Sequence, residues 1–271
     1  MSRPDPGAGL RAVILGCGSS PATPRIDGDW GACDPNNPKN RRSRCALLVE
    51  RRSPSGITRV LVDTGPDLYQ QMRSAEADWV DGVLYTHAHA DHIHGIDDLR
   101  GFVLGRRQRV DIYADRITFD HLQRAFGYCF ETPPGSSYPP ILNGHLIEAG
   151  MPVTITGDGG PITAMPFSQI HGSIESLGFR FGGLAYSCDI SDLPDQSLDA
   201  LKDLDVWIVD ALRYNPHPSH FSVAEAIEWS LRIAPRRTIL THMHIDLDYD
   251  ILASELPEGI EPGYDGLAIA L

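Results

Sequence analysis

The chain has 271 residues, 42% of them hydrophobic and 22% charged, and its 36 acidic against 23 basic residues give a net charge of −13. This composition excludes a disordered chain, and the acidic balance makes long nucleic acids and anionic membranes poor partners because like charges repel. The five cysteines form no CxxC pair, which excludes a disulfide framework and favours a reducing compartment, most simply the cytoplasm. No apolar run approaches the ~18 residues that a membrane-spanning helix needs.

Ten short apolar runs predict β-strands, because each is rich in β-branched or aromatic residues and is bounded by Gly, Pro, Asp or Asn. In chain order they are RAVIL (11–15), CALLVE (45–50), RVLVD (59–63), GVLYT (82–86), VDIYA (110–114), PVTIT (152–156), GFRFGGLAYSCD (178–189), DVWIVDA (205–211), RTILTH (237–242) and GLAIAL (266–271). The chain shows neither a fixed-period repeat nor a linker, so we expect a single domain over residues 1–271.

Helical patterns lie between these strands. They predict helices near 67–78, 95–104, 115–128 and 222–234. The last is the clearest, because Ser222 and Glu225 form a capping box and Pro235 stops the helix. Its expected apolar stripe is Ile227, Leu231 and Ala234. Strands and helices mixed in this way predict an α/β fold with a sheet core flanked by helices.

The segment LYTHAHADHIHGIDDLR (84–100) gathers metal-binding side chains directly after a predicted strand. If the chain stays extended, His87, His89 and Asp91 point to one side, and a turn after Asp91 brings His92 back to it. Three imidazoles and a carboxylate are too many for one tetrahedral zinc that also holds water, so they suit two metal ions. Mixed His/Asp ligands favour Zn²⁺, Mn²⁺ or Fe²⁺ over Mg²⁺ or Ca²⁺. Zn²⁺ is the first candidate and Mn²⁺ the second.

This His-x-His-x-Asp-His pattern after a hydrophobic strand resembles the metallo-β-lactamase superfamily. The resemblance implies a four-layer αββα sandwich with a binuclear metal site at one edge and further ligands on later strands. Candidates follow in the implied order. They are Asp63 in VLVDTGPD, His171 in SQIHGS, Asp189 after GLAYSC, and His242 and His244 in THMHID.

The resemblance also implies a role for each candidate. One ion would be held by His87, His89 and His171, the other by Asp91 and His92, with Asp189 between them. Asp63 would orient the ligands from behind, and either His242 or His244 would complete the second site. The sequence leaves that choice open, because side chains two positions apart in an extended chain face the same way. The isolated His121 and His145 have no partner pattern, and we expect ordinary structural roles for them.

A further histidine points to one branch of the superfamily. His220 lies two residues before the capping Ser222, which resembles the general-acid histidine of the phosphodiesterase branch. That branch includes RNase Z and the phosphoribosyl cyclic phosphate phosphodiesterases. A departing alkoxide needs a proton near neutral pH, and a histidine can supply it. We therefore group His220 with Asp91 and Asp63 as catalytic candidates, whereas His217 either supports the same pocket or is a loop residue.

One motif of that branch is missing. Its members often hold a structural zinc through a Cys-x-Cys-x-x-Cys cluster, but the corresponding stretch here offers only Cys33 and Cys45. We expect no structural zinc, so another interaction must hold this loop. The basic segments 39–44 and 105–109 could hold a phosphate, although solvated loops are the simpler explanation.

The predicted function is hydrolysis of a small, cyclic nucleotide or sugar phosphodiester with two divalent ions. The sequence shows no basic arm that would dock tRNA, which disfavours RNase Z activity. Two alternatives stay open: a thioester or lactone hydrolase on the same metals, and a non-catalytic protein that binds a phosphorylated ligand or cofactor. A homodimer is compatible with the sequence, which does not fix the oligomeric state.

Overall fold

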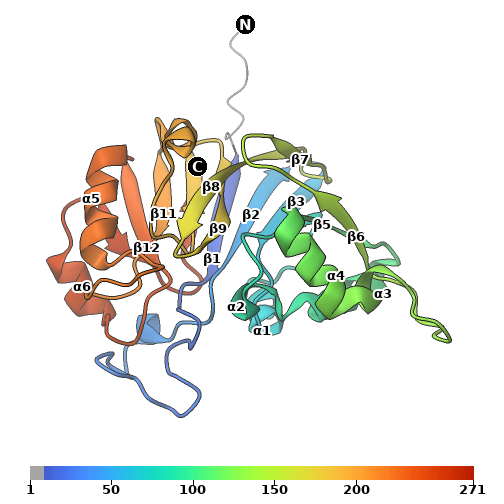
Figure 1. The fold of residues 1–271 in the computed structure, drawn as a ribbon, viewed down its shortest axis with the longest axis horizontal. Coiled ribbons are helices and arrows are strands. Elements are labelled where there is room, and N and C mark those ends of the chain that lie inside the picture. Colours follow the sequence, from blue (N-terminus) through green and yellow to red (C-terminus); the bar gives the residue numbers. More distant parts are fainter. Residues whose placement is uncertain (1–8) are drawn as a thin grey trace, which may run out of the picture.

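The computed structural model describes residues 9–271 and shows two seven-stranded sheets packed face to face (Figure 1). Helices α1 to α4 cover the outer face of the first sheet, and α5 and α6 cover that of the second (Figure 1). The predicted αββα sandwich is confirmed. Residues 1–8 of the predicted domain lie outside the described part of the chain. Within it, no helix is both long and apolar enough to cross a membrane.

The first sheet has the strand order β14-β1-β2-β3-β4-β5-β6. Its strands are β1 (Leu10–Gly16), β2 (Ala46–Ser53), β3 (Gly56–Val62), β4 (Gly82–Leu84), β5 (Val110–Ala114), β6 (Leu142–Leu146) and β14 (Ala268–Ala270). The second sheet has the order β13-β12-β11-β10-β9-β8-β7. Its strands are β7 (Val153–Ile155), β8 (Ile162–His171), β9 (Ile174–Phe181), β10 (Leu184–Ser187), β11 (Val206–Asp210), β12 (Arg237–Thr241) and β13 (Ile260–Pro262).

Short helices connect the strands. The α-helices are α1 (Leu68–Ser74), α2 (Ala90–Ile93), α3 (Arg100–Arg106), α4 (Arg116–Phe130), α5 (Val223–Ile233) and α6 (Tyr249–Glu255), and the 3₁₀ helices are η1 (Pro38–Asn40), η2 (Ile96–Leu99) and η3 (Asp195–Leu201). Alternation along the strands separates two hydrophobic layers. In β2, Leu47 and Val49 face the second sheet, whereas Leu48 faces the helices.

All ten predicted strands are present, with 178–189 forming the β9–β10 hairpin. The sequence missed β6, an edge strand in which four of five side chains are exposed, so no apolar alternation marks it. The ten-residue β8 and the three-residue β13 were not among the predicted strands either. In α5 the capping box is confirmed. The predicted stripe is right only at Ile227, which packs against the core, because Leu231 is 70% exposed and Ala234 is exposed as well. The buried positions there are Val223, Ala226 and Ser230.

Parallel pairing brings the site residues to one edge. β3, β4 and β5 run parallel in the first sheet, and β10, β11 and β12 run parallel in the second. The carboxyl ends of parallel strands meet at the same edge, where ligands usually bind. The residues at these ends are Asp63 after β3, His87 after β4, Asp189 after β10, Asp210 closing β11 and His242 after β12.

A buried arginine holds the long loop between β1 and β2. Arg42 is 1% exposed, and its guanidinium donates to the carbonyls of His244 and Leu247 and to Asn40 Oδ1. The Cys33 thiol donates to the carbonyls of Ile245 and Leu247. Both side chains therefore tie this loop to the segment that follows His242. This network is the alternative anchor that the missing cysteine motif requires.

Replacing Arg42 with Met should lower the free energy of unfolding by about 2–4 kcal/mol, because buried carbonyls lose their donors. Urea denaturation would measure the loss. Arg41 is the matched control: it is exposed and lies over Trp30, so Arg41→Met should change stability by less than about 0.5 kcal/mol. Equal effects at the two positions would contradict the anchoring role of Arg42.

Asp265 ties the C-terminal segment to the same region. Its carboxylate accepts from the backbone N–H groups of Cys17 and Ser43 and from the Ser43 hydroxyl. Burial raises the pKa of Asp265 to about 6, although these donors oppose the rise. The folded pKa is above the unfolded value, so the folded state binds more protons between about pH 4 and pH 6. The contribution of this group to stability is therefore present at low pH and is lost as the pH rises through 6.

Wild type and Asp265→Asn should therefore differ in stability in a pH-dependent way. On passing from pH 7 to pH 4, wild type should gain up to about 3 kcal/mol relative to the variant, which does not titrate. Unfolding by urea at a series of pH values would measure this difference. A difference that is constant with pH would contradict the shifted pKa.

Candidate metal centre

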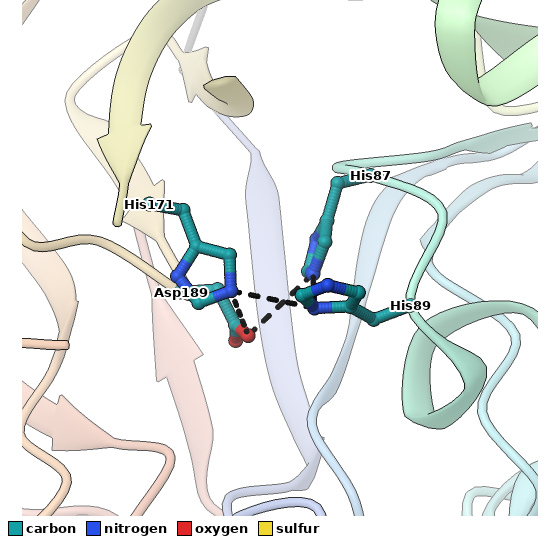
Figure 2. Close-up of side chains that lie close together, drawn as sticks. All are labelled: His87, His89, His171 and Asp189. Carbon is teal, nitrogen blue, oxygen red and sulfur yellow. Dashed lines mark hydrogen bonds and ion pairs between the residues drawn. The ribbon is translucent and has the colours of Figure 1, made fainter. Parts of the chain in front are cut away.

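Four side chains from three loops converge at the strand edge. Figure 2 shows His87 and His89 from the segment after β4 pointing toward His171 at the end of β8 and Asp189 after β10. His89 Nδ1 lies 2.8 Å from His87 Nε2 and 3.3 Å from His171 Nε2. Asp189 Oδ2 is 3.6 Å from His87 Nε2 and 3.5 Å from His171 Nε2. Ligand atoms around a tetrahedral zinc are about 3.3 Å apart, so this first group fits one ion.

A second group shares the same aspartate. His92 Nε2 and His242 Nε2 each lie 3.3 Å from Asp189 Oδ1. Asp91 Oδ2 is 3.6 Å from His92 Nε2 and 3.9 Å from His242 Nε2. The two oxygens of Asp189 thus face different groups, which is the geometry of a bridging ligand. Asp91, His92 and His242 could hold a second ion.

Unpartnered buried atoms support this interpretation. The Nε2 atoms of His92 and His242 are buried and have no hydrogen-bond partner within residues 9–271. A buried polar atom without a partner costs about 1–3 kcal/mol, so its presence needs a reason. Both atoms face Asp189 and Asp91, and a divalent cation between these four groups would satisfy them. The residues therefore fit metal ions.

Hydrogen bonds behind the ligands select their tautomers. His92 Nδ1 lies 2.7 Å from Asp63 Oδ2, and His171 Nδ1 lies 2.6 Å from the carbonyl of Ser219. In each case Nδ1–H donates, which leaves Nε2 free to bind a metal. Asp63 also accepts from the backbone N–H and the hydroxyl of Thr86. Asp63 is thus fully buried behind the site and orients it without being placed to touch an ion.

His220 lies over both groups. Its ring centroid is 4.7 Å from that of His171 and 4.6 Å from that of His242, with which it stacks at 10°. Its Nδ1 is 2.7 Å from Asp210 Oδ2, so Nε2 is the free nitrogen. The side chain is 11% exposed. It is therefore positioned to exchange a proton with a group held at the metal edge.

Asp210 is a further residue of this site, and we did not predict it from the sequence. Besides His220, it accepts from the backbone N–H of Ile190, and its Oδ1 lies 3.7 Å from His242 Nδ1. It is fully buried. The signal was available, because VWIVD ends in an aspartate as RVLVD does. Burial of an unpaired carboxylate costs free energy, so an Asp at the end of an apolar strand indicates that polar partners lie nearby.

Three site residues adopt the left-handed backbone region that favours glycine. The φ angles are 66° at Asp63, 53° at Asp189 and 57° at His242. Each follows the end of a strand, where the chain must turn to aim its side chain at the metal edge. A non-glycine residue there costs of order 1 kcal/mol, and such strain clusters at functional sites.

The ionisable side chains of the site shift one another's pKa values. Burial would lower the pKa of His92, but Asp189 and Asp63 raise it well above the ordinary value. The pKa of His242 rises to about 10, since Asp189 and Asp91 outweigh its burial. Burial and the neighbouring His92 lower the pKa of His87 well below its usual range. The pKa of Asp189, despite burial, is held well below normal by His242 and His92. The carboxylates thus create a field that favours positive charge between them.

The structure places the residues whose positions the sequence left open around this edge. The chain turns earlier than we expected, because α2 already begins at Ala90, and Asp91 points into the site from the helix. His242 joins the second group, but His244 does not: its ring nitrogens lie 2.6 Å from Arg25 and 3.2 Å from Asp246. His217 lies beside His220, with 5.1 Å between ring centroids.

The other residues named from the sequence lie outside both groups. His145 is on the edge strand β6 and pairs with Asp111, and His121 is in α4. The basic segment 39–44 is largely used within the fold, since Arg42 is buried and Arg44 pairs with Asp67. All five residues of the segment 105–109 are exposed.

The comparison with known families agrees with this geometry. The model of the beta-lactamase superfamily domain matches residues 58–243, a range that includes every member of both groups. The chain belongs to the beta-lactamase superfamily. Metal-binding hydrolase chemistry follows from this membership and from the His/Asp groups.

The curated relatives of this chain are named for different reactions. An octanoyltransferase of Porphyromonas gingivalis is 31% identical over 263 residues, which cover 95% of this chain and 51% of that protein. A ribonuclease Z of a Bradyrhizobium species is 26% identical over 151 residues, covering 53% of this chain and 46% of that one. The chain thus spans about half the length of these curated relatives.

Solved structures give a full-length match. The crystal structure of a diphosphatase from the PhnP family is 31% identical, with a TM-score of 0.85 over 97% of this chain and 98% of that one. Human tRNase Z, short form, has a TM-score of 0.63 at 17% identity over 96% of this chain and 98% of that one, and so shows the fold alone.

Proposed function

We propose that this protein is a metal-dependent phosphodiesterase that hydrolyses a small organic phosphate. The observation that carries the proposal is the placement of His220 over both metal-binding groups with its Nδ1 held by Asp210. A thiolate departs from a thioester without a proton, whereas expulsion of an alkoxide from phosphorus needs one. The substrate we propose is a small cyclic phosphodiester, whose ring opens by release of an alkoxide. The diphosphatase relative points instead to a phosphoanhydride, whose leaving phosphate does not need this proton, so a pyrophosphate belongs among the test substrates.

We assign separate roles in metal binding and proton transfer to the residues of the site. His87, His89, His171 and Asp189 would hold one ion, and Asp91, His92, His242 and Asp189 the other. Zn²⁺ is the ion we propose, with Mn²⁺ second. Bound there, the ions would supply positive charge for the phosphate oxygens and lower the pKa of a water molecule. In its doubly protonated form His220 donates the Nε2 proton to the leaving oxygen, and the ring is left as the neutral tautomer whose Nδ1–H donates to Asp210. The Asp210 carboxylate stabilises the doubly protonated ring.

Surface charge and cysteine chemistry support the substrate class and the compartment. A net charge of −13 favours a small substrate over a long nucleic acid, although ribonuclease Z is among the relatives. The five cysteines are free and buried, which supports a reducing, cytoplasmic location.

A second candidate is an acyl hydrolase that uses the same metals on thioesters or lactones. The octanoyltransferase relative is named for acyl chemistry, which favours this candidate, but this chain spans only 51% of that protein. His220 separates the two functions. Thioester turnover that survives the removal of His220 would favour the acyl hydrolase, because a thiolate departs without a proton.

A substrate panel tests the proposal. Zinc- and manganese-loaded proteins would be assayed with bis(p-nitrophenyl) phosphate, cyclic nucleotides, phosphoribosyl cyclic phosphates, dinucleoside pyrophosphates, thioesters and lactones. We expect turnover among the phosphate substrates, and the relative rates on them would identify the type of bond that the protein hydrolyses. Turnover of thioesters or lactones alone would contradict the proposal. Tight binding of a nucleotide with no turnover under either metal would favour a binding protein.

A further inference from the structure

A large cavity lies on the outer face of the first sheet, away from the metal centre. Its volume is about 890 Å³, within the range of small-molecule sites. Val13, Leu15 and Leu48 on β1 and β2 form an apolar floor, and Gln71 and Ser74 of α1 stand beside it. The cavity thus offers an apolar surface bounded by polar groups, which is the usual composition of a ligand site.

One end of this cavity carries three guanidinium groups around a single carboxylate. The register of the sheet places Arg11 of β1 opposite Glu50 of β2, and Glu50 opposite Arg59 of β3. Glu50 Oε2 accepts from Arg11 at 3.1 Å and from Arg52 at 3.0 Å, and its Oε1 accepts from Arg59 at 2.9 Å. The Glu50 side chain is 3% exposed. Burial would raise its pKa, but Arg59 and Arg52 lower it below the ordinary value.

In this arrangement the single carboxylate does not neutralise all three guanidinium groups, and some of their N–H donors stay unused. Arg11 and Arg52 are 44% and 55% exposed, and within residues 9–271 each uses one guanidinium nitrogen for a hydrogen bond. Arg59 also pairs with Asp78 at the surface. Six arginines and four carboxyl groups line the cavity, so it has a local excess of two positive charges in a chain of net charge −13. Several guanidinium groups together match the oxygens of a phosphate dianion, and the exposed donors of Arg11 and Arg52 are suited to hold one.

The cluster is separate from the catalytic edge. Arg59 lies four residues before Asp63 on β3, which corresponds to about 13 Å of extended strand. None of the groups around Glu50 belongs to either metal-binding group. A ligand here would therefore be distinct from the substrate of the metal centre.

We propose that this cavity binds a small organic phosphate monoester, such as a nucleotide. Its phosphate contacts Arg11, Arg52 and Arg59, and its planar or apolar part lies on the floor formed by Val13, Leu15 and Leu48. The inference does not depend on the proposed function, because the two sites share no residue.

Equilibrium dialysis of the metal-loaded protein tests this site with AMP, adenosine and inorganic phosphate as probes. The test variant is Arg11→Gln/Arg52→Gln, which leaves Arg59 to neutralise Glu50. The matched control is Arg116→Gln, because Arg116 is also an exposed arginine paired with one carboxylate, Asp120. AMP should bind wild type and the control equally, and the double variant at least about tenfold more weakly. Adenosine and inorganic phosphate should each bind wild type more weakly than AMP does.

Turnover of bis(p-nitrophenyl) phosphate by the double variant should stay within about twofold of wild type, since the cluster is far from the metal centre. AMP binding that is unchanged in the double variant, or absent from wild type at millimolar concentration, would overturn the proposal. So would a change of oligomeric state in the double variant without loss of AMP binding, because the cluster would then serve contacts between copies of the chain.

Discussion

Replacing His220 with Ala lowers turnover of phosphodiesters with alkoxide leaving groups by about 10²–10⁴-fold, the usual value of a positioned proton donor. The fall is much smaller for p-nitrophenyl esters, because nitrophenolate departs without a proton. Steady-state rates with both ester types, measured on variants of known metal content, give the two ratios. The difference between these ratios isolates proton donation from any general disturbance of the site.

Asp210→Asn provides the companion variant for this experiment. The amide cannot stabilise the charged imidazole as the carboxylate at 2.7 Å does, so we expect a loss in the same direction but smaller than that of His220→Ala. Equal losses for alkoxide and nitrophenolate esters in His220→Ala would contradict the proton-donor role. They would leave His220 as a residue that only packs against His171 and His242.

Asp189→Asn should remove the bridge between the two metal-binding groups. Each carboxylate oxygen faces a different group, and the amide offers one neutral oxygen in their place. We expect bound metal to fall from two ions to at most one per chain, and phosphodiester turnover to fall at least about a thousandfold. Asn suits this test because it has the size of Asp and tolerates the φ of 53° at this position.

Asp192→Asn is the matched control for Asp189, because it removes an exposed carboxylate three residues along the same loop. It should retain both ions and full turnover. Metal analysis after dialysis gives the stoichiometry of each protein. Two ions bound to Asp189→Asn with wild-type affinity would contradict the bridging role.

Much of the site could be predicted from the sequence, because each ligand follows a strand whose apolar pattern is clear. Asp63, Asp189 and the 87–92 segment lie at such ends, and parallel pairing brings these ends together. The last ligand could not be chosen in this way. We assumed an extended chain after β12, but the positive φ of His242 turns the backbone there, so His244 points to Arg25 and Asp246 instead.

Other features depend on tertiary contacts that no local pattern encodes. Arg42 lies in a basic segment that resembles a solvated loop, yet it is among the most buried side chains because its partners come from residues 244 and 247. The exposure of Leu231 has the same cause. The face of α5 that packs on the sheet is set by the sheet's position, and small residues such as Ala226 occupy it.

The most direct test of the two-metal phosphodiesterase is a titration of metal-stripped protein with Zn²⁺, in which bound metal and turnover of bis(p-nitrophenyl) phosphate are measured on the same samples. We expect no turnover without metal and a rise in turnover that is complete at two ions per chain. Two bound ions without any phosphodiester turnover, together with cleavage of a thioester or lactone, would contradict it.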